Sequence, residues 1–155
     1  MVTDKEAGPA WVGRAAVILD SFRRLLGREL VARSGDPVED ARRLFVLPVA
    51  VLAHDTSAQP LLDWANLAAA TAFDATPETL IGRPSAETAP ADARADRGRL
   101  FEALARHGYV TGYSGTRISL TGRRFTIEDV VVLELRDAAG NPAGHAAVIG
   151  KTRPG

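Results

Sequence analysis

The sequence predicts an α+β domain in which five antiparallel strands form one sheet, with short helices on one face and an N-terminal amphipathic helix. Near the N-terminus, apolar residues recur at steps of three and four, the period of an amphipathic helix. A continuous apolar run with β-branched residues follows at 45–54, as in a buried strand. Residues 109–149 contain three further β segments separated by turn sequences. Two strands, a helical crossover and three antiparallel strands make one sheet.

The first element is an amphipathic helix predicted over residues 10–33. Its apolar stripe either packs on the domain's own sheet or joins a second copy of the chain. Because a stripe of this size needs a cover, we predict a homodimer through residues 11–30. A second short helix begins at Asp36 and Pro37, an N-cap followed by a residue suited to the first turn, and runs to about Phe45. The stripe comprises Trp11, Ala15, Ile18, Phe22, Leu25, Leu26 and Leu30.

The first strand is expected to be paired over residues 49–54. Pro48 belongs at its entrance, because proline has no N–H to donate within a sheet. The remaining elements are listed in chain order: a strand at 61–64, a short helix at 66–73, a helical turn at 77–80, a helix at 92–107, and strands at 109–119, 125–135 and 143–149.

The composition fits a single domain and excludes several function classes. The chain has 155 residues, 46% of them apolar, which is enough for a core without disulfides. Nineteen Lys and Arg balance nineteen Asp and Glu, so we predict no nucleic-acid partner and no membrane partner. The absence of cysteine excludes disulfides, thiolate metal sites, cysteine nucleophiles and cysteinyl-flavin photochemistry. Three widely spaced histidines predict no metal site.

The chain lacks the usual sequence signals of export or membrane insertion. The longest apolar stretches are about nine residues, too short to span a bilayer. The start, MVTDKEAGPA, has no apolar region of a signal peptide. We therefore expect a cytoplasmic protein. The expected organisation is a disordered lead at 1–9, N-terminal helices at 10–45, the main domain at 46–150 and a tail at 151–155.

The segment LDWANLAAATAFDATPETLIGRPS resembles the middle of a PAS domain. Such domains have an aromatic strand, an Asn that opens an Ala-rich helix, an aromatic residue and a Pro-Glu-x-Leu-Ile-Gly-Arg turn. These features correspond here to Trp64, Asn66, Phe73 and residues 77–83. The stretches AHDTSAQPLLDWAN, YSGTRISLTGRRFTIEDVVVLEL and GHAAVI, together with their surroundings over residues 15–150, are similar to the bacterial MEKHLA family, a PAS-like group.

This resemblance implies a PAS-like domain over residues 46–150, with strand order 2-1-5-4-3 and a cavity between the sheet and its short helices. It implies no reaction and no particular cofactor. PAS-like domains bind haem, flavins or small metabolites, pair with one another, or do none of these. The cofactor is therefore left open, and function has to be argued from the site.

Arg117 and Asp129 form the first candidate pair. Along the strand that begins at Phe125, alternation places Asp129 on the apolar core face, where a carboxylate needs a cation or a donor. Arg117 on the preceding strand can hold such a carboxylate through two hydrogen bonds. The pair either lines a polar pocket or is an internal salt bridge; alternatively, a bulge turns Asp129 to solvent.

Two histidines and two further polar residues complete the candidate ligand-binding set. His54 ends the first strand and either contacts a ligand or is a hydrogen-bonded structural residue. His145, on the last strand, adds a second imidazole if its face points into the cavity. Asn66 is either a helix N-cap or faces the cavity. The full predicted set is His54, Asn66, Tyr113, Arg117, Asp129 and His145.

Three functions are compatible with these patterns. The first is a stand-alone PAS-like module that binds or senses a small molecule and acts through a dimer or a partner. The alternative is a small enzyme that performs acid/base chemistry on a metabolite with His54, Tyr113, Arg117 and Asp129. The third is a dimerisation scaffold with a filled core. The sequence contains no phosphate-binding Gly-rich loop, nucleophile elbow or His-Glu-x-x-His motif.

Overall fold

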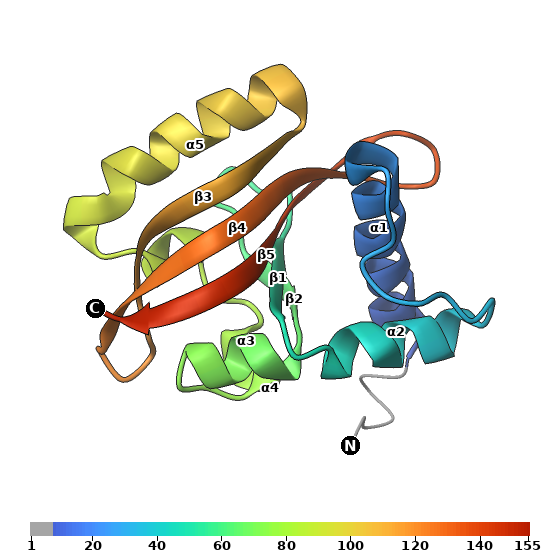
Figure 1. The fold of residues 1–155 in the computed structure, drawn as a ribbon, viewed down its shortest axis with the longest axis horizontal. Helices are drawn as coiled ribbons and strands as arrows, with labels where there is room; N and C mark the ends of the chain where they lie inside the picture. Colours follow the sequence, from blue (N-terminus) through green and yellow to red (C-terminus); the bar gives the residue numbers. More distant parts are fainter. Residues whose placement is uncertain (1–7) are drawn as a thin grey trace.

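The computed structural model describes residues 8–155, apart from the side chains of residues 94–97 (Figure 1). The lead predicted as disordered, residues 1–9, therefore lies almost wholly outside the described residues. The elements in chain order are α1 Pro9–Leu26, α2 Pro37–Val46, β1 Ala50–His54, β2 Leu62–Ala65, α3 Leu67–Ala72, α4 Pro77–Leu80, the 3₁₀ turns η1 Ser85–Thr88 and η2 Ala91–Ala93, α5 Arg94–His107, β3 Tyr109–Ile118, β4 Arg124–Arg136 and β5 Pro142–Pro154.

The five strands form one antiparallel sheet in the order β2-β1-β5-β4-β3. This confirms the predicted strand order. In Figure 1, α5 runs beside β3, whereas α1 and α2 lie at the other end of the sheet. β5 continues to Pro154 and pairs with β4 along its length, so residues 151–154 belong to the sheet and do not form the expected tail.

The core has two apolar layers, one on each face of the sheet. In the first layer, α1 and α2 pack on the sheet, and the rings of Trp11, Phe45 and Trp64 contact one another with centroids 5.5–6.3 Å apart. In the second layer, α3, α4 and α5 pack on the opposite face, where Phe73 contacts Phe125 edge-on at 5.1 Å. The short central helices and the N-terminal helix therefore lie on opposite faces.

α1 ends earlier than its apolar period predicts. Gly27 adopts a left-handed conformation with φ of 72°, and its N–H donates to Arg23 O, which ends the helix seven residues before the predicted boundary at 33. The centre of the apolar stripe, including Ile18 and Phe22, is buried against the domain's own sheet. Of the two interpretations of the stripe, packing within the chain is the one observed.

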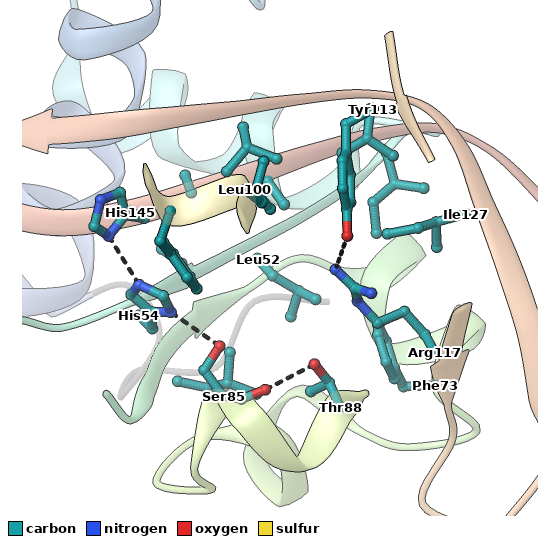
Figure 2. A pocket seen from close by; sticks show the side chains of 18 residues that line it. Leu52, His54, Phe73, Ser85, Thr88, Leu100, Tyr113, Arg117, Ile127 and His145 are labelled. Atoms are coloured by element: carbon teal, nitrogen blue, oxygen red, sulfur yellow. Dashed lines mark hydrogen bonds between the residues drawn. The ribbon is translucent and has the colours of Figure 1, made fainter. Parts of the chain in front are cut away.

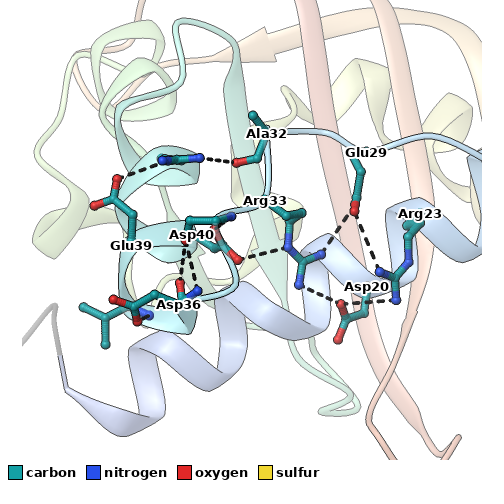
Figure 3. A network of polar contacts seen from close by, with 11 residues as sticks. Asp20, Arg23, Glu29, Ala32, Arg33, Asp36, Glu39 and Asp40 are labelled. Carbon is teal, nitrogen blue, oxygen red and sulfur yellow. Dashed lines mark hydrogen bonds and ion pairs between the residues drawn. The ribbon is translucent and has the colours of Figure 1, made fainter.

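A network of polar contacts fastens the loop between α1 and α2 (Figure 3). Arg33 donates to Asp20 at 3.1 Å and to Asp40 at 3.2 Å. Asp40 is buried and also accepts from the Ser34 N–H at 2.7 Å and from the Ser34 hydroxyl at 2.8 Å. The pKa of Asp40 is lowered, first by the backbone N–H of Ser34 and then by the Ser34 hydroxyl and Arg33.

Asp40→Asn is expected to lower the free energy of unfolding at neutral pH by roughly 1–3 kcal/mol, because it weakens several charge-assisted hydrogen bonds. A carboxyl whose pKa is lower in the folded state stabilises the fold above its unfolded pKa, which is about 4, and loses this contribution as the pH falls through the folded pKa. Urea unfolding at neutral and acidic pH measures the free energy of unfolding of both proteins. The difference between wild type and Asp40→Asn is expected to be smaller in acid. A difference that is unchanged in acid contradicts this, and the surface variant Glu39→Gln serves as the control.

Candidate functional site

A cavity of about 60 Å³ lies between the sheet and the elements that cover its inner face (Figure 2). β1, β3, β4, β5, η1 and α5 all contribute side chains to it. Most of the lining is apolar and includes Leu52, Phe73, Leu100 and Ile127. Four of the six predicted site residues line this cavity, and they are His54, Tyr113, Arg117 and His145.

The two histidines face each other across neighbouring strands. His54 at the end of β1 is opposite His145 of β5 in the register of the sheet. Nε2 of His54 lies 3.0 Å from Nδ1 of His145, a hydrogen-bond distance. The ring of Phe101 from α5 packs against both imidazoles, with centroids 5.7 and 5.2 Å away. The pair is thus held between the sheet and α5.

Ser85 extends this pair into a chain of three polar side chains. Its hydroxyl lies 2.9 Å from Nδ1 of His54, and His54 is only 5% exposed. η1 positions Ser85, because the Thr88 hydroxyl donates to the Ser85 carbonyl at 2.8 Å within this turn. Each imidazole nitrogen either donates or accepts, so this chain can pass a proton or present a donor or an acceptor to a small molecule.

Arg117 and Tyr113 form the opposite end of the cavity. Arg117 is 7% exposed; its Nη1 donates to Thr116 O at 2.8 Å and its Nη2 to the Tyr113 hydroxyl at 3.4 Å. Gly115 lies between them on β3, where a Cβ would come within 2.7 Å of the Tyr113 hydroxyl oxygen. Because Gly115 has no side chain, the side chains of Tyr113 and Arg117 can meet above it. Among the described residues, no carboxylate forms an ion pair with Arg117.

The expected inward position of Asp129 is wrong. Its side chain is exposed and its backbone has a positive φ of 54°. In the β3–β4 pairing, Tyr113 is opposite Val130 but Gly115 is opposite Ile127, so Glu128 and Asp129 form a bulge. The bulge shifts the alternation of side chains by one residue. After it, Val130 and Val132 lie on the cavity face, whereas Val131 and Leu133 lie on the opposite face. Arg117 and Asp129 consequently do not form a pair.

Asn66 is fully buried and does not line the cavity. Its Oδ1 accepts from Val51 N at 2.9 Å and from Ala69 N at 3.0 Å. Through the second of these hydrogen bonds, Asn66 caps the N-terminus of α3. Its Nδ2 donates to Val49 O at 2.8 Å and Leu44 O at 3.1 Å. Of the two predicted roles, capping is the one observed, and the amide also ties α3 to β1 and α2.

Asp55, the sequence neighbour of His54, is directed to its own turn. Its carboxylate accepts from the N–H groups of Leu61 and Ser57. These bonds, that of Leu61 first, lower the pKa of Asp55. Nδ1 of His54 instead contacts Ser85, a residue absent from the predicted site. Ser85 follows a proline in an irregular segment, where no period indicates which side chains face inward.

The sequence model of the MEKHLA domain matches residues 12–153, nearly the whole chain. The chain belongs to the MEKHLA domain family. The resemblance predicted from the residues is thus confirmed. A search of curated proteins found no match to this MEKHLA domain.

Solved structures place this MEKHLA domain in the PAS-like fold. The PAS domain of a protein from Colwellia psychrerythraea is 17% identical with a TM-score of 0.63, over 75% of this chain and 93% of that one. The photo-excited blue-light photoreceptor Vivid is 14% identical with a TM-score of 0.59, over 86% and 94%. The PAS domain, in complex with ethanol, of a LuxR-family transcriptional regulator from Burkholderia thailandensis is 18% identical with a TM-score of 0.55, over 69% and 92%. At these identities the likeness establishes the fold alone.

In this MEKHLA domain, Arg14 of α1 binds the main chain behind the histidine pair. Its Nη2 donates to His54 O at 3.0 Å, its Nη1 to Ala143 O at 2.7 Å and its Nε to Asp63 at 3.1 Å. Burial raises the pKa of Asp63 even though Arg14 opposes this shift. Arg14 lies outside the apolar stripe of α1, and only the fold shows that this side of the helix meets the ends of β1 and β5.

Two further observations concern metal ligands and membrane-spanning helices in this MEKHLA domain. Over the described part of the chain, no three His, Cys, Asp or Glu side chains are grouped so that they could hold a metal ion. Within the same residues, no helix has both the length and the apolar character needed to cross a membrane.

Proposed function

We propose that this MEKHLA domain is a sensory module that binds a small molecule in the cavity and passes the signal to a partner protein or a second copy of the chain. The observation that supports this most strongly is the arrangement of the cavity. Polar groups lie at the two ends of the cavity, and the middle is apolar. Arg117 and Tyr113 lie at one end, and the hydrogen-bonded side chains of Ser85, His54 and His145 lie at the other. Such a lining binds the body of a ligand by burial and orients its polar groups.

The size of the cavity restricts the ligand to a few non-hydrogen atoms. Pockets for drug-sized ligands measure about 300–1,000 Å³, whereas this cavity has about 60 Å³. A haem or a flavin does not fit among these side chains, and the chain has no cysteine for a flavin adduct. The similar PAS domain from Burkholderia thailandensis is described in complex with ethanol, a molecule of suitable size.

Arg14 provides a route from the cavity to the surface. It connects the carbonyl of His54, whose side chain lines the cavity, to α1. In the proposal, a ligand that shifts the main chain at His54 displaces α1 through this hydrogen bond. In the proposal, a dimer through residues 11–30 uses the exposed side of α1, because the apolar side is covered by the chain's own sheet. Light scattering with and without ligand measures this association directly.

Ala147→Leu tests ligand binding, because Ala147 lines the cavity and a larger side chain there fills it. Native mass spectrometry of the unheated protein is expected to show the mass of a small bound molecule in wild type and its loss in this variant. Ala105→Leu, an exposed change on α5, is the matched control and is expected to keep the extra mass. If all three proteins have the mass of the bare chain, the proposal is contradicted.

Acid/base catalysis on a small metabolite is a second candidate, and the contact between Ser85 and His54 favours it. A hydroxyl 2.9 Å from an imidazole is positioned to transfer its proton and act as a nucleophile. Asp129 takes no part, since it lies at the surface. The test is hydrolysis of p-nitrophenyl acetate by wild type and Ser85→Ala. A rate that depends on Ser85 supports an enzyme, and equal rates contradict it.

A further inference from the structure

Arg117 is a buried cation whose hydrogen-bond partners among residues 8–93 and 98–155 are all neutral. Its guanidinium is bonded to a backbone carbonyl and a tyrosine hydroxyl, and it stacks near the Tyr113 ring, 5.7 Å from the centroid. Apolar side chains, with Phe73 and Ile127 among them, make up most of the cavity lining that it shares. Burying a charge among such groups is costly unless an opposite charge meets it.

The nearby carboxylates do not supply that opposite charge. Glu128 accepts from Arg153, and Asp129 is turned to solvent by the bulge. Among the described residues, no other acidic group lies within ion-pair distance of Arg117, and the guanidinium has no hydrogen bond beyond those given above. The described part of the chain therefore offers Arg117 no counter-charge, and a bound anion can supply it.

From this geometry we infer that the ligand of the cavity is a short-chain monocarboxylate whose carboxylate binds Arg117. A guanidinium has five N–H donors in a planar fork, of which two are used here, and the fork matches a carboxylate. Leu52, Phe73 and Ile127 provide an apolar surface for a short carbon chain. The small volume limits that chain to a few carbons. The inference rests on the proposed function, because it names the chemical class of the proposed ligand.

An inorganic anion has the same charge but no carbon chain. It would satisfy Arg117 and leave the apolar middle of the cavity unfilled. The carboxylate is therefore favoured over phosphate, and the two are separated by experiment. A second polar group on the carbon chain of the ligand, such as a hydroxyl or keto oxygen, would be directed to Ser85 and His54.

The test compares sodium propionate with propionamide, which has nearly the same shape and no charge. Calorimetric titration of the wild-type chain is expected to show binding of propionate that is at least about tenfold tighter than binding of propionamide. Sodium chloride and sodium phosphate at matched ionic strength are the controls for salt and for an inorganic anion. Binding of phosphate in place of propionate, or of propionamide as tightly as propionate, overturns the inference. Binding of propionamide alone overturns it and leaves the proposed ligand-binding function in place.

Arg117→Met is expected to abolish the preference for propionate over propionamide. It should also raise the melting temperature of the ligand-free protein by roughly 2–4 °C, because it removes a buried charge. Arg42→Gln, an exposed change on α2, should leave both quantities unchanged. If Arg117→Met does not fold, Arg117→Lys keeps the charge without the fork and should bind propionate more weakly than wild type.

Two outcomes with the Arg117 variants would overturn the inference. One is an unchanged preference for propionate in Arg117→Met. The other is full wild-type affinity for propionate in Arg117→Lys, which would show that the fork plays no part. If neither propionate nor propionamide binds the wild-type chain, and native mass spectrometry also finds the bare chain, the inference and the proposed function fail together.

Discussion

Asn66→Ala should lower the free energy of unfolding by about 4 kcal/mol, a large part of the total stability of a domain of this size. The side chain is fully buried, and its amide joins three elements of the fold. Its removal takes away the Asn66 partner of the Val51 N–H and of the Val49 carbonyl in the core, and one of the two donors to the Leu44 carbonyl. It also removes the N-cap of α3.

The matched control for Asn66 is Thr76, the exposed N-cap of α4. Thr76→Ala removes a cap of the same kind without leaving buried polar groups, and should cost about 1 kcal/mol. Urea unfolding followed by circular dichroism measures both variants. A cost for Asn66→Ala no greater than that for Thr76→Ala would mean that the core contacts of the amide contribute little.

The positions of most helices and strands could be predicted because the signals that set them are local. A cap residue contacts an N–H only two or three positions ahead, so Asp36, Asn66 and Thr76 could be recognised from their neighbours. The end of α1 was missed because Leu30 continues the apolar period beyond Gly27. The left-handed conformation of Gly27 ends the helix even though apolar residues continue at helical spacing.

The face of β4 could not be predicted in full because a bulge depends on the partner strand. Alternation is correct as far as Ile127 and then fails at Asp129, where pairing with β3 adds a residue. Asp is one of the residues that tolerates a positive φ, so the sequence permits the bulge without requiring it. The predicted partner of Arg117 was lost for this reason.

The candidate site was predicted in part, and the missing residues share a cause. His54 and His145 lie on strands whose inward faces follow from alternation, and the resemblance to PAS domains implied the cavity. Ser85 and Arg14 come from a 3₁₀ turn and from the polar side of a helix. Their contacts span at least 31 positions in sequence, so only the tertiary structure brings them to the histidine pair.

Gly144→Ala is expected to be still more damaging, with a loss of at least about 4 kcal/mol or failure to fold. A Cβ at this position would lie 1.9 Å from the carbonyl oxygen of His54, which is backbone and cannot rotate away. Gly144 also has a φ of 100°, a conformation that an L side chain rarely adopts. β1 would have to separate from β5 at the point where His54 meets His145.

Gly140→Ala separates the two causes. Gly140 has a similar positive φ of 86°, but its Cβ would meet no atom within 4 Å. The free energy of unfolding of Gly140→Ala should therefore fall only by the cost of placing an L residue at a positive φ, about 1–2 kcal/mol. The measurement is the free energy of unfolding of both variants, together with imidazole chemical shifts that report the contact between His54 and His145. Similar losses in the two variants would assign the effect to φ alone. A larger loss for Gly144→Ala, with changed histidine signals, would show that the close approach of the His54 carbonyl, which also accepts from Arg14, maintains the histidine end of the cavity.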